Sequence, residues 1–464
     1  MELVFGSAGA YEFRYAPGLR SLSPARVVVD EEFRYPHHPV PVRSVRTVPE
    51  PGPTDPAVLA TVRGLVGEFT ERYARIKTRP PRFGPGYGED EIAAAEARIG
   101  VRLPEDLRAL YRVVRDDMAE HGLLGRKSLM PLDEVVREYL ASGLGSWGWN
   151  DDVFGVNRVV LESAPYGRIR RLSRGVRWIT VATDRACNWC AVDLDPAPGG
   201  VSGQLFEYGR DHHGPVGYVA ESVTAILRDV VAALRSGTCV DEDPAEAYLV
   251  LPERIGAAVQ VDHGAAVGLG DTSVAAAVAT LPSPSDVQQL YLNDGEHVDL
   301  AELAPLPRLR SVRVNRAGTV ELAVPHTVPL ESLEVTAGTT GLAPLAGHPS
   351  IWDVTIAGTT HPVRIAPLLD LPALTRLDLS AVTVHDLDLV ARMPTLRVLV
   401  LDQAQWRHLR EAGAVPERLA AAELTGAPTL ADAVAWAGIL GPTPAVVLRT
   451  LVGRVPAPAD GHRR

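Results

Sequence analysis

The feature that most constrains this chain is an internal repetition in its second half. A six-residue frame, apolar-x-x-apolar-x-apolar, occurs six times, and successive frames begin 22, 21, 21, 23 and 22 residues apart. The frames are Val287/Leu290/Leu292, Leu309/Val312/Val314, Leu330/Leu333/Val335, Ile351/Val354/Ile356, Leu374/Leu377/Leu379 and Leu396/Leu399/Leu401. A period near 22 that holds over six copies predicts small units, each of which buries its apolar side chains only by stacking on its neighbours.

This frame and period are typical of leucine-rich repeats, in which each frame forms a strand. Segments such as LAPLPRL, IAPLLDLPAL and LVARMPTL precede the frames and supply the return turn. One position departs from the usual repeat. The third residue after the last apolar position normally is Asn or Cys, and here it is Gly295, Ala317, Gly338, Thr359, Val382 and Ala404. The ladder of asparagines that satisfies backbone groups in such repeats is therefore missing, which leaves the detailed geometry open.

The first half of the chain has a different pattern. Residues 55–77 and 89–100 carry apolar side chains at helical spacing, and LPEDLRALYRVV continues with a third amphipathic segment. The short runs WITVA, WCAVDLD and QLFEYG predict strands joined by tight turns, and ESVTAILRDVVAAL predicts a closing helix. Helices followed by an antiparallel sheet and a helix indicate the α+β class.

These patterns predict several parts in a chain of 464 residues, which is too long for one compact core. The predicted parts are an N-terminal extension with one helix (1–79, helix 55–77), an α+β domain (80–236), a connector (237–280), an α/β leucine-rich-repeat solenoid of six repeats (281–404), a helical cap (405–455) and a disordered tail (456–464).

Several short motifs follow one another through the predicted α+β domain. The first is E-x-x-I-x-x-x-E-x-x-x-G-x-x-L-P-x-D-L-x-x-L-Y, which begins at Glu89 and ends at Tyr111. The later ones are Trp178-Ile179, Asp193-Leu194-Asp195-Pro196 with Gly199-Gly200, Gly203-Gln204-Leu205 and Ser222 to Leu227. In these motifs, residues of about 85–236 resemble the Smi1/Knr4, or SUKH, superfamily. The glycine and proline that many relatives carry near residue 180 are replaced by Thr180 and Ala182.

The resemblance implies a fold of helices packed on a mostly antiparallel sheet, with no catalytic centre to carry over. It also implies a mode of action, in which the sheet surface and its loops bind another protein. The superfamily includes bacterial immunity proteins, which neutralise toxins that often are nucleases, and fungal regulators of cell-wall signalling.

Ten residues are candidates for binding a partner protein. Trp147 and Trp149 lie in a polar, Gly-rich segment and either anchor a partner or fill the domain's own core. Asp193 and Asp195 either contact a basic partner or cap the turn before Pro196. The residues between the last two apolar positions of each frame face the concave side of the predicted solenoid, where the alternative is a merely solvated surface. These are Tyr291, Arg313, Glu334, Thr355, Asp378 and Val400.

Composition narrows the classes of partner. The formal net charge is −11, and residues 281–404 hold fourteen acidic residues and eight arginines. Nucleic acids and anionic membranes need clustered cations, so the net charge argues against both as partners and permits a basic protein partner. The start of the chain shows no secretory signal and no apolar run approaches the roughly 20 residues of a membrane span, so we expect a cytoplasmic bacterial protein.

The sequence predicts no catalytic, cofactor-binding or metal-binding residues. Cys187-x-x-Cys190 and His212-His213 have the letters of a zinc site, but the two cysteines lie inside a strand motif, where buried cysteine is common. No combination of nucleophile, base and oxyanion donors is evident, and the known short catalytic motifs are absent from the sequence.

Two functions compete on this basis. The first is a non-enzymatic immunity-type protein that binds and neutralises a toxin, such as a nuclease. The second is a housekeeping regulatory or scaffold protein that bridges partners through the α+β domain and the repeats. The partner, the binding surface and the oligomeric state are not predicted.

Overall fold

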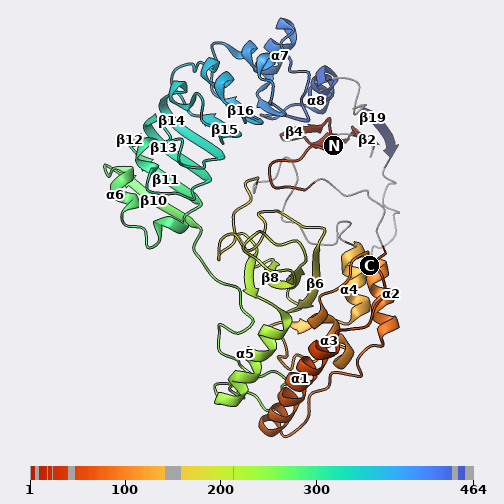
Figure 1. The fold of residues 1–464 in the computed structure, drawn as a ribbon. Helices are drawn as coiled ribbons and strands as arrows, with labels where there is room; N and C mark the ends of the chain where they lie inside the picture. The colour runs from red at the N-terminus through yellow and green to blue at the C-terminus, as the bar shows by residue number, and fades with distance from the viewer. Residues whose placement is uncertain are drawn as a thin grey trace, which may run out of the picture. The chain divides into compact units, whose positions relative to one another are not determined.

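The structure is a computed structural model, and it describes residues 2–5, 10–17, 19–22, 24–39, 48–141, 158–212, 214–440 and 448–454. The chain divides into two compact units, unit 1 with residues 1–33 and 262–464, and unit 2 with residues 34–261 (Figure 1). Unit 2 is therefore an insertion between an N-terminal segment and the repeats. The predicted tail, residues 456–464, lies outside the described residues.

Unit 2 has the predicted order of helices, antiparallel sheet and closing helix. Its elements are α1 (Pro56–Lys77), α2 (Glu89–Ile99), α3 (Glu105–Val113), β5 (Ser128–Leu129), α4 (Leu132–Ala141), β6 (Trp178–Thr183), β7 (Asn188–Asp193), β8 (Gln204–Gly209), β9 (Gly217–Ala220) and α5 (Val223–Ser236). The strands pair in chain order, β5-β6-β7-β8-β9, and every pair is antiparallel.

Helix α1 forms where its sequence pattern predicts. Asp55 caps it, because its Oδ1 accepts hydrogen bonds from the backbone N–H groups of Ala57 (2.8 Å) and Val58 (3.1 Å), and Pro56 opens the first turn. Its buried stripe packs against α3 and α5. The helix at 55–77 therefore belongs to the core of unit 2, which differs from the separate extension predicted from sequence.

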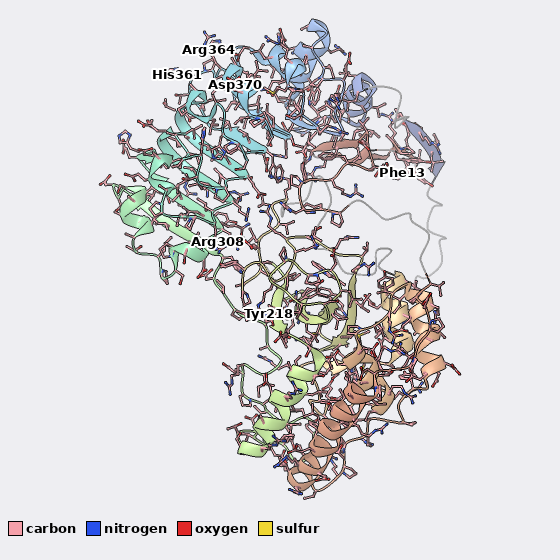
Figure 2. All side chains as sticks on the ribbon, in the orientation of Figure 1. Phe13, Tyr218, Arg308, His361, Arg364 and Asp370 are labelled. Atoms are coloured by element: carbon pink, nitrogen blue, oxygen red, sulfur yellow. The ribbon has the colours of Figure 1, made fainter. Side chains whose placement is uncertain are left out.

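The sheet of unit 2 is covered on both faces. One face carries Ile179, Val192 and Leu205, which pack with the helices in the main core. The other face carries a smaller aromatic cluster that includes Trp178, Phe206 and Tyr218, of which Figure 2 labels Tyr218. This explains why β6 and β8 are buried along their whole length, including polar residues such as Thr180, Gln204 and Glu207.

Unit 1 contains the repeats and the N-terminal strands. Its strands are β1 (Glu2–Phe5), β2 (Ala10–Tyr15), β3 (Leu19–Leu22), β4 (Ala25–Val28), β10 (Gly264–Gly270), β11 (Gln289–Gly295), β12 (His297–Asp299), β13 (Ser311–Glu321), β14 (Ser332–Gly341), β15 (Asp353–Ala357), β16 (Arg376–Ala381), β17 (Val398–Leu401), β18 (Ala421–Leu424) and β19 (Arg449–Arg454). Its α-helices are α6 (Val274–Val278), α7 (Gln403–Ala412) and α8 (Leu430–Ala437), and 3₁₀ turns η2 (Pro284–Asp286), η3 (Leu300–Leu303), η4 (Ala343–Leu345), η5 (Ala366–Asp370), η6 (Leu387–Arg392) and η7 (Gly438–Leu440) complete it.

The last two residues of each predicted frame lie on one of six neighbouring parallel strands, β11, β13, β14, β15, β16 and β17, and the first residue precedes the strand (Figure 1). The middle apolar residues align across the sheet, as Leu290 with Val312, Leu333 with Val354 and Leu377 with Leu399 show. All eighteen frame residues are at most 4% exposed and belong to one core. The prediction that the frames stack in register is confirmed.

The absence of the asparagine ladder has a structural explanation. In the first repeats the chain stays extended beyond the frame, so that Thr319 pairs with Thr339 and His297 with Thr319 in the neighbouring repeats. A Cβ at Gly318 would lie 2.6 Å from the Glu296 carbonyl oxygen, so this close stacking requires glycine there. Near the other end, the Gln405 side-chain amide donates to the Leu379 and Val382 carbonyls (2.9 and 2.8 Å). Backbone pairing and one glutamine thus replace the ladder.

The sheet extends beyond the six frames at both ends. Strand β10, in the predicted connector, adds one parallel strand before β11. Strand β18, in the predicted helical cap, adds another after β17, and β4 pairs with it antiparallel. The corresponding frame at β18 is Leu419, Ala422 and Leu424. The sequence pattern did not predict it, because its central residue is alanine and not a large apolar residue. Helices α7 and α8 lie in the predicted cap, but the N-terminal strand β4 completes that end.

Candidate interaction surfaces

The six predicted concave-face residues form one row across the repeat sheet. Strand pairing places Tyr291 beside Arg313, Arg313 beside Glu334 and Glu334 beside Thr355, and the row continues through Asp378 to Val400. We call this row, with the side chains next to it on the same side of the strands, the open face. It exists because side chains alternate along each strand, with the frame residues on the opposite side in the core.

The charged side chains of the open face pair with one another. The Arg313 guanidinium lies 2.6 Å from the Glu334 carboxylate and 5.7 Å from the centre of the Tyr291 ring. Further along, Arg376 contacts both Asp353 (2.9 Å) and Asp378 (3.2 Å) and donates to the Thr355 hydroxyl (3.0 Å). The open face is thus a network of ion pairs that join neighbouring strands.

Exposure falls along the row. Tyr291 is 36% exposed and the Arg313 side chain 44%, whereas Val400 is only 1% exposed. Val400 therefore offers no side-chain surface to a partner, and its prediction as a contact residue is corrected. A valine has no polar group to keep it at a wet surface, so its burial is the expected alternative.

Asp193 and Asp195, the other predicted acidic contacts, have different environments. Asp193 is fully buried, and its carboxylate accepts hydrogen bonds from the Asp195 backbone N–H (3.0 Å) and the Gln204 side chain (2.9 Å). Burial raises the pKa of Asp193 above its usual value. Of the two roles that the sequence leaves open for Asp193, the structure therefore favours the one in which it holds the turn before Pro196. Asp195 is half-exposed and pairs with Arg170 at 3.1 Å.

The remaining predicted positions give less information. Trp147, Trp149 and His213 lie outside the described residues. Cys187 is exposed, whereas Cys190 faces the helical core, and burial raises the pKa of its thiol well above the ordinary value. Within the part of the chain that the structure describes, no three His, Cys, Asp or Glu side chains converge as metal ligands.

The two glutamates of the first motif converge on one arginine. Glu96 is 1% exposed, its carboxylate lies 2.5 Å from the Arg108 guanidinium, and it also accepts a hydrogen bond from the Leu103 backbone N–H (2.8 Å). Glu89 contacts the same arginine at 2.9 Å. Arg108 is fully buried. These charges therefore hold α2, α3 and the turn between them together.

Other residues of the motifs also have structural roles. Gly100 ends α2 in the left-handed conformation with a φ of 83°, which favours glycine. The Asp106 carboxylate accepts a hydrogen bond from the Thr224 backbone N–H at the start of α5 (3.0 Å), and the Tyr111 hydroxyl donates to the Met130 carbonyl (2.9 Å). The motif residues thus specify the fold of unit 2 and leave the identity of a partner open.

Residues 86–229 match the model of the SMI1 / KNR4 family (SUKH-1). This match confirms a SUKH domain in unit 2, and we use that name for residues 86–229. Unit 2 adds α1 before the matched segment and a C-terminal segment after it. The family is generally non-catalytic, and its members are commonly immunity proteins, which indicates a protein-binding role.

Comparison with other proteins adds little about function. No curated protein matches the chain. Among solved structures, the chain is similar to the internalin InlF of Listeria monocytogenes, with 14% identity, 35% of this chain and 56% of that chain covered, and a TM-score of 0.21. It is also similar to a Bacteroides fragilis protein, with 12% identity, 52% of this chain and 84% of that chain covered, and a TM-score of 0.24.

A charged cluster that the sequence motifs do not indicate lies at one end of the sheet of the SUKH domain. Lys127 is 9% exposed, and its ammonium lies 3.2 Å from Glu207 and 3.9 Å from Asp184. Burial acts to raise the pKa of Asp184, but hydrogen bonds from Asn188 and from the Ala186 backbone outweigh it and leave that pKa below its usual value. His212 lies 3.6 Å from Glu207, and burial lowers its pKa.

One signal in the sequence points to this cluster. Of the 46 Lys and Arg residues, only Lys77 and Lys127 are lysines, and both are buried in ion pairs, Lys77 with Asp241 and Lys127 with Glu207. In this arginine-rich chain both lysines thus coincide with buried ion pairs, where a compact ammonium contacts a carboxylate.

Proposed function

We propose that this protein is a non-enzymatic, cytoplasmic binding protein of the immunity type, which neutralises a toxin by binding it. The observation that carries the proposal is the SUKH match at residues 86–229, whose motif residues form internal contacts of the fold. The acidic balance of the chain, −11, supports a basic partner such as a nuclease domain, because opposite charge speeds encounter.

We further propose that residues 264–424 form a leucine-rich-repeat solenoid whose open face is a second contact surface. Neighbouring strands at a spacing of 21–23 residues, with buried frames and exposed side chains at Tyr291 and Arg313, support this assignment. Tyr and Arg are enriched where interfaces bind tightly. No helix in the described ranges is both long and apolar enough to cross a bilayer.

The test captures partners with the tagged full-length chain from its native host and then measures inhibition. The expected result is a captured toxin whose activity, for example DNA or RNA cleavage, falls to zero at about one equivalent of this protein. Full-length protein is needed because a fragment such as 281–464 lacks β10 and β4, which complete the repeat sheet at either end. A captured protein that retains its full activity in the complex would contradict the immunity role.

The second candidate is a scaffold that bridges two partners. The observation in its favour is that the chain builds two units with separate cores. Its test uses Arg313→Glu in the open face, which removes the pairing with Glu334. If Arg313→Glu releases one of two captured proteins and leaves the other bound, the scaffold function is supported; if both are retained or both lost, it is not.

A further inference from the structure

We propose that a pocket in unit 2, between the turn at residues 122–128 and the segment at residues 248–253, receives an arginine side chain of a partner protein. This inference rests on the protein-binding role proposed above. The pocket has a volume of about 450 Å³, which lies within the usual range for binding sites. One wall belongs to the SUKH domain, and the other lies beyond the segment that matches the family.

Two glycines join the walls of the pocket. A Cβ at Gly125 would lie 2.9 Å from the Gly256 Cα, and a Cβ at Gly256 would lie 2.8 Å from the Leu124 carbonyl oxygen. Both have positive φ, 77° and 65°. Because the two backbones meet without intervening side chains, the segment after residue 253 is held close to the turn at residues 122–128.

The segment that forms the outer wall is anchored to helix α1. The Tyr73 hydroxyl donates to the Ala247 carbonyl (2.6 Å), and Lys77 pairs with Asp241 and donates to the Asp243 carbonyl (2.9 Å). Val240 and Val250 exchange backbone hydrogen bonds of 2.9 Å in both directions. The wall therefore has a defined position before any partner arrives, which reduces the entropy lost on binding.

The charges around the pocket favour a cation. Three lining residues, Glu120, Asp184 and Glu253, are acidic, and two, Arg126 and Lys127, are basic. The Lys127 ammonium forms an ion pair with the Glu207 carboxylate at 3.2 Å. The Arg185 guanidinium lies 3.7 Å from the Glu120 carboxylate. With Glu207 and Arg185 both counted, four carboxylates and three cations surround the pocket.

The remaining lining residues suit the shape of arginine. Tyr248, at 40% exposure, presents an aromatic ring beside the carboxylates, and aromatic rings attract guanidinium groups. Leu249 and Leu251 supply apolar surface for the methylene stem of a long basic side chain. Arginine combines a planar cation that stacks on a ring with donors for two carboxylate oxygens.

The experiment measures binding of a defined probe to the full-length chain. Acetyl-arginine amide is titrated while the methyl signals of Leu249 and Leu251 are followed by ¹³C NMR, and acetyl-citrulline amide serves as the uncharged probe of the same shape. We expect saturable shifts of both signals with the arginine probe and at least about tenfold weaker binding of the citrulline probe, because a charge-assisted contact is lost.

Two exposed positions allow matched variants. Tyr248→Ala and Glu253→Gln are each expected to weaken the arginine probe about two- to fivefold. The control is Glu242→Gln, an exposed glutamate that precedes the segment at residues 248–253 and lies outside the pocket, and it should not change the affinity. Equal affinity for both probes, equal effects of the variants and the control, or no shift at a probe concentration on the order of 10 mM overturns the inference.

Failure of this inference is distinguishable from failure of the proposed function. If a toxin is captured and inhibited equally well by the wild type and by a Tyr248→Ala/Glu253→Gln double variant, the pocket inference fails and the immunity role stands. If the arginine probe occupies the pocket but no captured protein is inhibited, the immunity role fails and the arginine site stands.

Discussion

The two units of this protein are stabilised by different means. Unit 2 adds buried charges to its apolar core, and Arg108 of α3 contacts Glu89 and Glu96 of the preceding helix α2. Unit 1 depends on columns of apolar side chains that are nearly equivalent from one repeat to the next. We expect the loss of one buried charge to lower the stability of the whole of unit 2. The loss of one apolar side chain in unit 1 should affect mainly its own repeat and the neighbouring repeats. From this comparison we expect a destabilising substitution to unfold unit 2 as a whole and unit 1 only near the substituted repeat.

The largest effect is expected for Arg108→Met in unit 2. The substitution leaves Glu96 buried without its cation, which costs about 3–5 kcal/mol of unfolding free energy. Hydrogen exchange of peptides from β6 to β8 reports the loss across the unit. Arg75→Met is the control, since Arg75 and Glu71 are both 72% exposed and 3.7 Å apart, and it should change nothing measurable. A loss confined to α2 and α3 would contradict the comparison.

A slightly smaller and more local effect is expected for Leu333→Ala in unit 1. Leu333 is fully buried on β14, so the cavity costs about 2–5 kcal/mol. Faster hydrogen exchange should appear in β13, β14 and β15 and fade toward β17. Leu333→Met keeps the volume and should cost less than about 1.5 kcal/mol. Uniform loss of protection over all repeats would show that unit 1 is as cooperative as unit 2.

A third effect depends on pH and comes from one polar residue in an apolar column. The residue before proline in five successive repeats is buried: Leu306, Val328, His348, Leu371 and Met393. Burial, followed by the nearby His326 ring at 5.4 Å, lowers the pKa of His348 below its usual value of 6.5. Below that pH the unfolded chain binds a proton that the folded unit does not, so folding stability falls as pH decreases.

His348→Leu should therefore stabilise unit 1 more at pH 5 than at pH 8, with about 1.4 kcal/mol for each unit by which the folded pKa lies below the unfolded one. Thermal unfolding at both pH values measures the difference. His361→Leu, the same substitution at an exposed histidine of unit 1 (Figure 2), is the control against which the difference is measured. An equal gain for His348→Leu at pH 5 and pH 8 would refute a proton-linked cost at this residue.

The smallest effect is expected on the open face. Arg313→Ala removes an exposed ion pair with Glu334 and should cost less than about 1 kcal/mol, and even less in high salt. Chemical denaturation at low and high ionic strength tests this. A loss of several kcal/mol would mean that even an exposed ion pair strongly stabilises unit 1.

Some features of the fold were predictable because they rest on local periodicity. The frames from Val287 to Leu401 and the stripe of α1 follow spacings of two and 3.6 residues that any observer of the sequence can count. Strands β10 and β18 were not predicted as repeat strands, because Ala265 and Ala422 occupy positions where other repeats have leucine or valine. Small side chains give no periodic signal, although they pack equally well between two neighbours.

Candidate site residues were less predictable, because their role depends on burial. Tyr291 and Arg313 lie exposed on the open face as the alternation predicts, whereas Val400 and Asp193 are buried. Alternation assigns a side chain to a face of a strand, but it does not say what covers that face. The pocket at Lys127 combines segments that lie 120 residues apart in sequence, so only the folded chain brings them together.

The sequence by itself determined the repeat period, the register of the frames and the SUKH motifs, because each is written in spacings along a contiguous stretch of chain. Only the tertiary structure decided that residues 25–28 pair with the far end of the repeat sheet, that Glu89 and Glu96 share Arg108, and that Gly125 meets Gly256. No spacing in the sequence predicts these contacts. They form only when folding brings the segments together, and their free energy must then offset the entropy cost of closing the intervening loops.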